Sequence, residues 1–217
     1  RSGRRGTDVE TIPRPSWRPF VLIALVVTIA LASSATPTPL YVEYRHVWGT
    51  SSPMITVVYA VYALSVLVPL LFLGRLSDSV GRRPVILAGL ALLAVSMTVL
   101  AAAPGIGWLI VARILQGLAV GTITGPASAA LIELHPRRDS RIGALISGST
   151  MNFGIAGGVL LSAVVATSSS SPLVHPYLYI LVATLVLLAA VWARVPETAG
   201  GSSTVREALR VRRPTVP

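Results

Sequence analysis

Long apolar stretches, separated by short polar or basic segments, dominate the chain. An α-helix needs about 20 mainly apolar residues to cross the roughly 30 Å hydrocarbon core of a bilayer. Six segments meet this requirement, and their weak amphipathic periodicity is typical of helices with apolar surroundings on all sides. The pattern predicts an all-α polytopic membrane protein with one bundle of six transmembrane helices. The predicted spans are residues 19–40, 53–73, 84–103, 107–131, 142–167 and 177–193.

The joints between these segments support the division. Pro53, Pro84 and Pro176 lie at or next to predicted helix starts, where a missing N–H costs no hydrogen bond. Ala-Pro-Gly at 103–105 predicts a tight turn. The first segment also resembles a signal peptide, because a basic tail precedes it. Five further spans follow it and it is long enough to cross, so we interpret it as a retained helix.

The composition agrees with a lipid environment. Hydrophobic residues make up 53% of the 217 residues and charged residues only 12%, whereas soluble domains carry about 25% charged residues. The mean hydropathy is +0.74. The chain has no cysteine, which excludes disulfides, thiolate metal sites and cysteine nucleophiles.

The formal net charge of +10 has a topological explanation. Sixteen of the 18 basic residues, all arginines, lie in the two tails, the second-to-third loop and the fourth-to-fifth loop. With six helices these segments fall on one side, which the excess of arginine marks as the cytoplasm. We therefore predict a protein of the plasma (inner) membrane with both termini in the cytoplasm, and no nucleic-acid partner.

Residues 74–83, G-R-L-S-D-S-V-G-R-R, form the most specific string in the chain. Gly74 permits close helix approach, and Gly81 permits a positive φ in a tight turn. Asp78 is a lone carboxylate among the arginines of this turn. A solvated turn with an incidental ion pair, worth under about 1 kcal/mol, needs only positive charge. It does not require the aspartate or the two glycines, so a functional turn is favoured.

The fourth segment contains one charge, Arg113, which costs about 2.5–3.5 kcal/mol on membrane-insertion scales. One interpretation is snorkelling to the outer interface, because Trp108 lies only five residues away. The other places Arg113 and Gln116 on a polar cavity. The adjacent glutamine and the glycines that follow favour the cavity.

Glycines at four-residue spacing predict close helix packing. They occur in the fourth segment as Gly117, Gly121 and Gly125, and the fifth segment carries Gly154, Gly157 and Gly158 in the same role.

Other polar candidates for a cavity are few. Tyr59 and Tyr62 lie three residues apart and are neighbours on a helix surface; they fit cavity lining and interface anchoring equally well. Asn152 needs a partner or water within a membrane. No Asp or Glu lies at mid-membrane depth in a predicted span. Proton coupling must therefore use Glu133, Asp78, Arg113 or a group outside the chain, or be absent.

Four motifs resemble one family. Residues 74–83 match the signature G-x-L-[AS]-D-x-x-G-R-[RK] at every defined position, and residues 113–121 match R-x-x-Q-G-x-x-x-G. Residues 153–158 keep the paired glycines of G-P-x-x-G-G but lack its proline, and residues 195–198 are typical of the family's midpoint. The chain thus resembles the N-terminal six-helix half of a major facilitator superfamily transporter, most like the drug-efflux branch.

This resemblance implies transport of a small solute by alternating access between two six-helix halves. It implies a cytoplasmic latch in which Asp78 and Arg82 pair and the carboxylate faces a helix N-terminus of the opposite half. It makes Arg113 a candidate for proton coupling or anionic solute contact. The latch residues are Gly74, Asp78, Gly81, Arg82 and Arg83, with Glu133 as a third charged member.

The expected organisation is a basic cytoplasmic tail (1–18), the bundle (19–195), and a cytoplasmic linker or truncated tail (196–217). We expect the chain to be a fragment whose partner is a second six-helix half, or a homodimer that rebuilds the cleft. A non-transporting membrane scaffold is the alternative. The chain has no P-loop, G-x-S-x-G or His/acid cluster, so no enzyme, metal or cofactor is predicted.

Overall fold

The computed structural model describes residues 17–72, 81–133 and 140–195, which form helices joined by short turns, with no strand among them. Six helical segments within this part of the chain are long and apolar enough to cross a membrane. The protein is therefore an all-α polytopic membrane protein, as its sequence predicts. Its helices are α1 (Trp17–Ala35), α2 (Pro37–Trp48), α3 (Ser52–Phe72), α5 (Arg82–Ala101), α6 (Ile106–Glu133), α7 (Ser140–Ser168) and α8 (His175–Arg194).

The first span departs from its prediction. It was expected to end at residue 40, but the chain stays helical to Trp48, with an interruption between Ala35 and Pro37. Pro37 occupies the first position of α2, where a proline removes no intrahelical bond. Gly49 ends α2 in the left-handed conformation, with a φ of 62°. The other five predicted spans agree with the structure to within two residues at each end.

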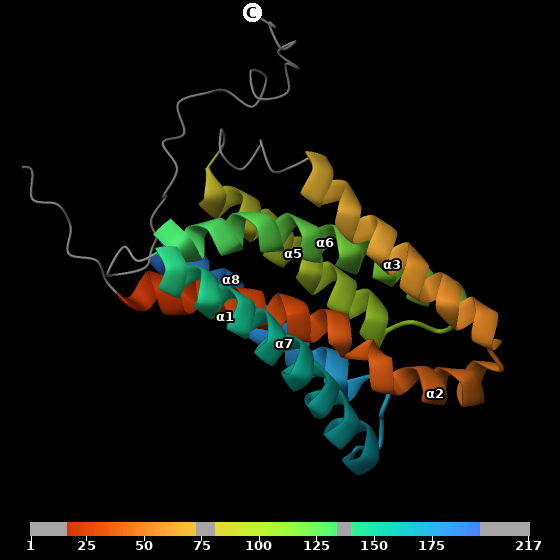
Figure 1. Cartoon of the computed structure of the whole chain (residues 1–217). Coiled ribbons are helices and arrows are strands. Elements are labelled where there is room, and N and C mark those ends of the chain that lie inside the picture. The colour runs from red at the N-terminus through yellow and green to blue at the C-terminus, as the bar shows by residue number, and fades with distance from the viewer. Residues whose placement is uncertain (1–16, 73–80, 134–139, 196–217) are drawn as a thin grey trace, which may run out of the picture.

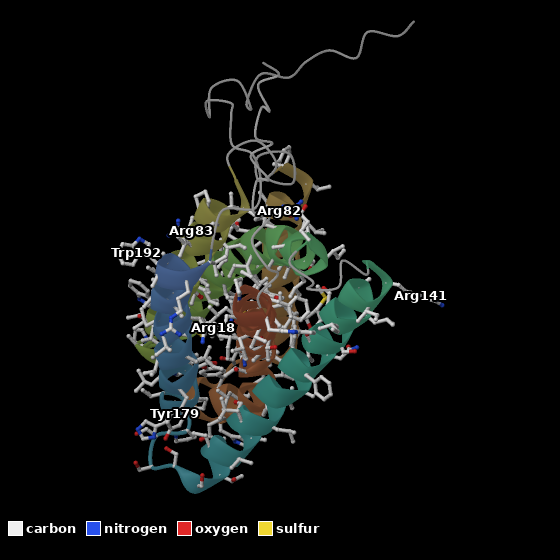
Figure 2. The ribbon with its side chains drawn as sticks, turned by 90° about the vertical axis from the view of Figure 1, so that its left-hand side faces the viewer. Arg18, Arg82, Arg83, Arg141, Tyr179 and Trp192 are labelled. Carbon is white, nitrogen blue, oxygen red and sulfur yellow. The ribbon has the colours of Figure 1, made fainter. Side chains whose placement is uncertain are left out.

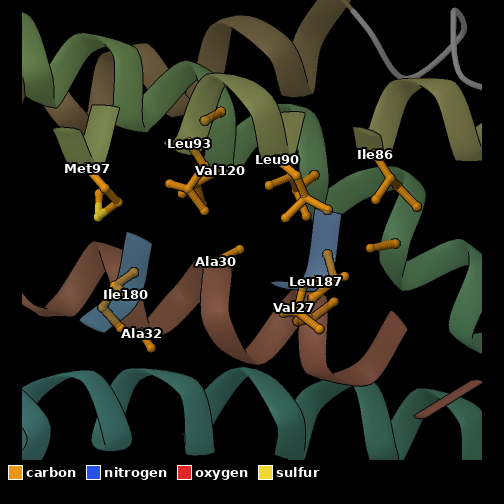
Figure 3. Packing of buried hydrophobic residues seen from close by; sticks show 14 of the residues in the cluster. Val27, Ala30, Ala32, Ile86, Leu90, Leu93, Met97, Val120, Ile180 and Leu187 are labelled. Atoms are coloured by element: carbon orange, nitrogen blue, oxygen red, sulfur yellow. The ribbon is translucent and has the colours of Figure 1, made fainter. Parts of the chain in front are cut away.

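The core lies between α1, α5, α6 and α8. Helix α5 packs on α6 and α8, α1 packs on α6, α7 and α8, and α3 packs on α6. Figure 3 shows Leu90 and Leu93 of α5 on one side of this core and Val27 and Ala30 of α1 on the other. All four side chains are buried.

Helices α3 and α7 lie at opposite edges of the bundle (Figure 1). Along α3 only Val58, Ser65 and Pro69 are buried. One face of α7 packs on α1, and large side chains such as Phe153 and Leu160 remain exposed on the remainder. Both helices therefore present wide surfaces to their surroundings.

Candidate functional site

The break between α1 and α2 releases backbone acceptors inside the bundle. Pro37 and Pro39 have no N–H, so the carbonyls of Ser33 and Ala35 have no partner four residues on. Thr36 instead bonds back to the Ala32 carbonyl, through both its N–H at 3.0 Å and its Oγ1 at 2.8 Å. A freed carbonyl buried in the bundle requires a donor from elsewhere.

Two side chains of α6 supply donors to this break. Gln116 Nε2 donates to the Ser33 carbonyl at 2.8 Å, and Arg113 Nη1 donates to the Ser34 carbonyl at 3.2 Å. Arg113 Nη1 also donates to Gln116 Oε1 at 2.6 Å. Because the two residues are three apart, they share one face of α6. Both side chains are completely buried.

Three tyrosines surround the guanidinium. Arg113 Nε donates to Tyr41 Oη at 3.1 Å, and Nη2 bonds to the same oxygen. The guanidinium carbon lies 5.5, 5.9 and 5.0 Å from the ring centroids of Tyr41, Tyr59 and Tyr62. Each such contact of a cation with a ring face is worth about 0.5–2 kcal/mol. Aromatic faces and carbonyls thus offset part of the cost of a buried cation.

The hydroxyl groups of Tyr59 and Tyr62 connect α3 to the break between α1 and α2. Tyr62 Oη donates to Ser34 Oγ at 2.8 Å, and Tyr59 Oη donates to Thr38 Oγ1 at 3.2 Å. Among the described residues, no carboxylate pairs with Arg113. We call Arg113, Gln116, Tyr41, Tyr62 and the Ser33–Ser34 carbonyls the arginine network. It joins α1, α2, α3 and α6 around one uncompensated positive charge.

The structure encloses the whole Arg113 side chain in protein, whereas snorkelling would bring its guanidinium to the surface of the bundle. An open polar cavity around Arg113 and Gln116 is not observed either, because both residues are fully buried in this conformation. Tyr59 and Tyr62 do contact the guanidinium. Asn152 does not belong to this site; it lies on an exposed part of α7.

The charged end of the bundle holds part of the predicted latch. Arg82 Nη2 lies 2.6 Å from Glu133 Oε1, so the start of α5 is paired with the end of α6. Gly81 has a φ of 109°, as expected for its place before α5. Arg83 donates to the Trp192 carbonyl of α8. Gly74 and Asp78 lie outside the described residues.

The glycine predictions divide into two groups. A Cβ on Gly117 or Gly121 would lie 2.6 or 2.5 Å from atoms of α3, and one on Gly154 or Gly158 would lie 2.5 or 2.1 Å from α1 carbonyls. These four glycines permit close helix contact, as predicted. For Gly125 and Gly157 no atom of the described residues lies within 4 Å of the added Cβ, so close packing at these two glycines stays a prediction. Their helix faces are open at these positions.

Sequence reasoning missed three members of the arginine network: Tyr41 and the carbonyls of Ser33 and Ser34. For the Ser33 carbonyl the available signal was Pro37, which must leave that carbonyl unbonded in a membrane helix. The prolines gave no signal for the Ser34 carbonyl or for Tyr41. A buried arginine and glutamine elsewhere in the chain are suitable donors for such carbonyls.

Comparisons with known proteins identify the family. The model of the Major Facilitator Superfamily matches residues 23–217. An uncharacterized transporter of Rickettsia bellii is 36% identical over 118 residues, which cover 53% of this chain and 28% of that protein. The multidrug resistance protein MdtL of Klebsiella pneumoniae is 28% identical over 113 residues, covering 52% and 29%. The class G tetracycline resistance protein of Vibrio anguillarum is 45% identical over 73 residues, covering 34% and 18%. The matched segments thus span less than a third of each relative's length.

Proposed function

The chain belongs to the major facilitator superfamily, and we propose that it forms one six-helix half of a secondary transporter that expels a small solute by alternating access. The family match and its transporter relatives support membrane transport rather than an enzymatic reaction. The names of the multidrug and tetracycline resistance relatives favour efflux. The observation that carries the proposal is the arginine network, a buried cation placed where one membrane helix is broken.

The arginine network lies where a conformational change between α1 and α2 would alter its hydrogen bonds. Its donors lie on α6, while its acceptors lie on both sides of the break between α1 and α2. A movement of α2 relative to α1 therefore requires these bonds to be exchanged. A broken membrane helix that lines a binding region is a recurrent feature of transporters.

Arg113 acts in this proposal as a fixed positive charge. An arginine keeps its proton in proteins, so it cannot itself carry protons through a transport cycle. It can bind an anionic group of the solute, or favour the ionised form of a carboxylate brought near it. The proton carrier of a coupled cycle would then be Asp78, Glu133 or a carboxylate of the other half.

We place the second half against the exposed face of α7. The exposed face of α7 combines small and polar positions, such as Gly148, Asn152 and Gly157, with Phe153. The exposed residues of α8 include no glycine or asparagine and are mainly large and apolar, such as Leu185 and Val186, as lipid contact favours. Small residues permit close helix approach in membranes, so the α7 face fits a protein partner better than lipid. The same face could meet a second copy of the chain.

The proposed organisation keeps the division of the sequence. Residues 1–18 form a cytoplasmic tail, 19–195 the bundle, and 196–217 a cytoplasmic linker toward the second half. Both termini lie in the cytoplasm of the cell that holds the protein in its plasma membrane. The arginine distribution supports this orientation.

Transport can be measured with everted membrane vesicles that contain the intact protein. The lumen of the vesicles is made acidic, so that protons leave as the solute enters. We expect tetracycline or ethidium to accumulate in the lumen above the level reached in vesicles that lack the protein. An ionophore that exchanges protons for potassium should abolish this accumulation. If accumulation continues in the presence of the ionophore, transport is not coupled to protons. Absence of flux for a broad panel of solutes, with correct insertion, would contradict transport and favour a scaffold role.

A further inference from the structure

A groove lies where α1 begins and α8 ends, at the basic end of the bundle. Five residues line it, and they are Trp17, Arg18, Val21, Leu22 and Arg194. Its volume is about 640 Å³, within the range of roughly 300–1,000 Å³ that is usual for small-ligand sites. The contact between antiparallel α1 and α8 brings the first turn of one helix beside the last turn of the other.

Two arginines line this groove, one from each helix. Arg18 and Arg194 are both exposed, and within the described ranges no carboxylate pairs with either side chain. Guanidinium groups bind phosphate oxygens with paired hydrogen bonds. A topological role requires only that arginines occur on this side of the membrane, and it does not require two of them to line one groove.

The apolar part of the groove leads from Arg18 into the membrane. Val21 and Leu25 lie one turn apart on α1, and they are 48% and 44% exposed. Trp17 is 52% exposed and stands at the start of the span, where tryptophan is typical of the headgroup region. A phospholipid has the same order of groups, with a charged headgroup above an apolar chain. A free phosphate would contact only the arginines and not the apolar surface.

We propose that this groove binds one anionic phospholipid, with its phosphate between Arg18 and Arg194 and an acyl chain along Val21 and Leu25. A second groove, between α5 and α8, is lined by Leu87, Ala88, Ala91, Leu185, Leu188, Ala189 and Trp192. It contains no cation and so cannot select a headgroup. The proposal requires only that the protein is in a membrane, and it is independent of the transport cycle.

Native mass spectrometry of the purified protein in detergent tests this site. We expect phosphatidylglycerol to bind and phosphatidylcholine to bind much more weakly. Each arginine near an anionic headgroup is worth about 1 kcal/mol, or roughly fivefold in affinity. The R18Q and R194Q variants should therefore each lose about fivefold in phosphatidylglycerol affinity, and the double variant about 30-fold.

Arg141→Gln is the matched control. It removes the same charge from the same end of the bundle, but Figure 2 places Arg141 on α7, away from Arg18 and α8. Its phosphatidylglycerol affinity should equal that of the unmodified protein. Equal loss in R141Q would overturn the site, because net charge would then explain binding. Equal affinity for phosphatidylcholine, or for inorganic phosphate alone, would also overturn it. Circular dichroism of each single variant tests whether the helices are still folded, so that weaker lipid binding can be assigned to the lost arginine.

Discussion

Replacing Arg113 with methionine should abolish transport by the intact protein while leaving the bundle inserted in the membrane. Methionine removes the charge-assisted hydrogen bonds to the Ser34 carbonyl and Gln116 Oε1. Bonds of this kind are worth about 1.5–3 kcal/mol each. If the transport cycle depends on them, the rate falls by about 100-fold or more.

Insertion should survive this change for a separate reason. Removing the charge recovers about 2.5–3.5 kcal/mol on insertion scales, while acceptors left without a donor cost about 1–3 kcal/mol each. These opposing effects are similar in size, so stability changes far less than transport. The measurement is initial efflux rate against the amount of inserted protein.

Two further variants sharpen the result. Arg113→Lys keeps the charge but not the forked geometry, so it should retain more transport than R113M and less than the unmodified protein. Arg45→Gln removes an exposed arginine at the end of α2 and should leave the rate unchanged. Full transport by R113M would reduce the arginine network to a packing feature.

Gly158→Ala should destabilise the bundle by about 1–3 kcal/mol, the usual cost of overpacking. The added Cβ would lie 2.1 Å from the Ala32 carbonyl oxygen and 2.7 Å from two other Ala32 backbone atoms. Backbone atoms cannot rotate away, so α7 and α1 must separate. Ala32 precedes Ser33, whose carbonyl accepts the Gln116 bond, so the arginine network is also strained. The midpoint of thermal unfolding in detergent measures the loss.

The neighbouring glycine provides a matched control. Gly157→Ala places its Cβ where no atom of residues 17–72, 81–133 or 140–195 lies within 4 Å, and alanine gains about 0.8–1 kcal/mol in helix propensity over glycine. In the 217-residue chain, the G157A variant should be as stable as the unmodified chain or slightly more so. A midpoint in G158A equal to that in G157A would contradict the observed contact between α1 and α7.

The membrane helices follow from the sequence because their requirement is simple. A bilayer demands about 20 apolar residues in succession, and that count can be made without knowing any contact. The exception was the region after residue 40. There Glu43, Arg45 and His46 lower the hydropathy, but they do not prevent a helix. Hydropathy therefore located the span but underestimated its length.

The site was only partly predictable. Arg113 and Gln116 could be selected because polar groups in a span need partners. Their partners could not be selected in this way. Every residue has a backbone carbonyl, so the sequence does not distinguish the carbonyls that accept these bonds, and Tyr41 lay beyond the predicted first span. The glycines show the same limit. Adjacent residues point about 100° apart around a helix, so Gly158 meets α1 whereas Gly157 does not. Sequence alone does not locate the neighbouring helix.

Alternating access can be tested directly on the exposed face of α7. The chain has no cysteine, so single cysteines at Leu145 and Val164, 65% and 62% exposed, report without background from this segment. They lie about 28 Å apart along the helix. Alkylation rates should be measured in the intact protein with and without a transported solute.

The account predicts opposite changes at the two positions: when solute raises the alkylation rate at one cysteine, it lowers the rate at the other. Rates that remain constant, or that rise and fall together, would contradict a bundle that exposes its two ends in turn.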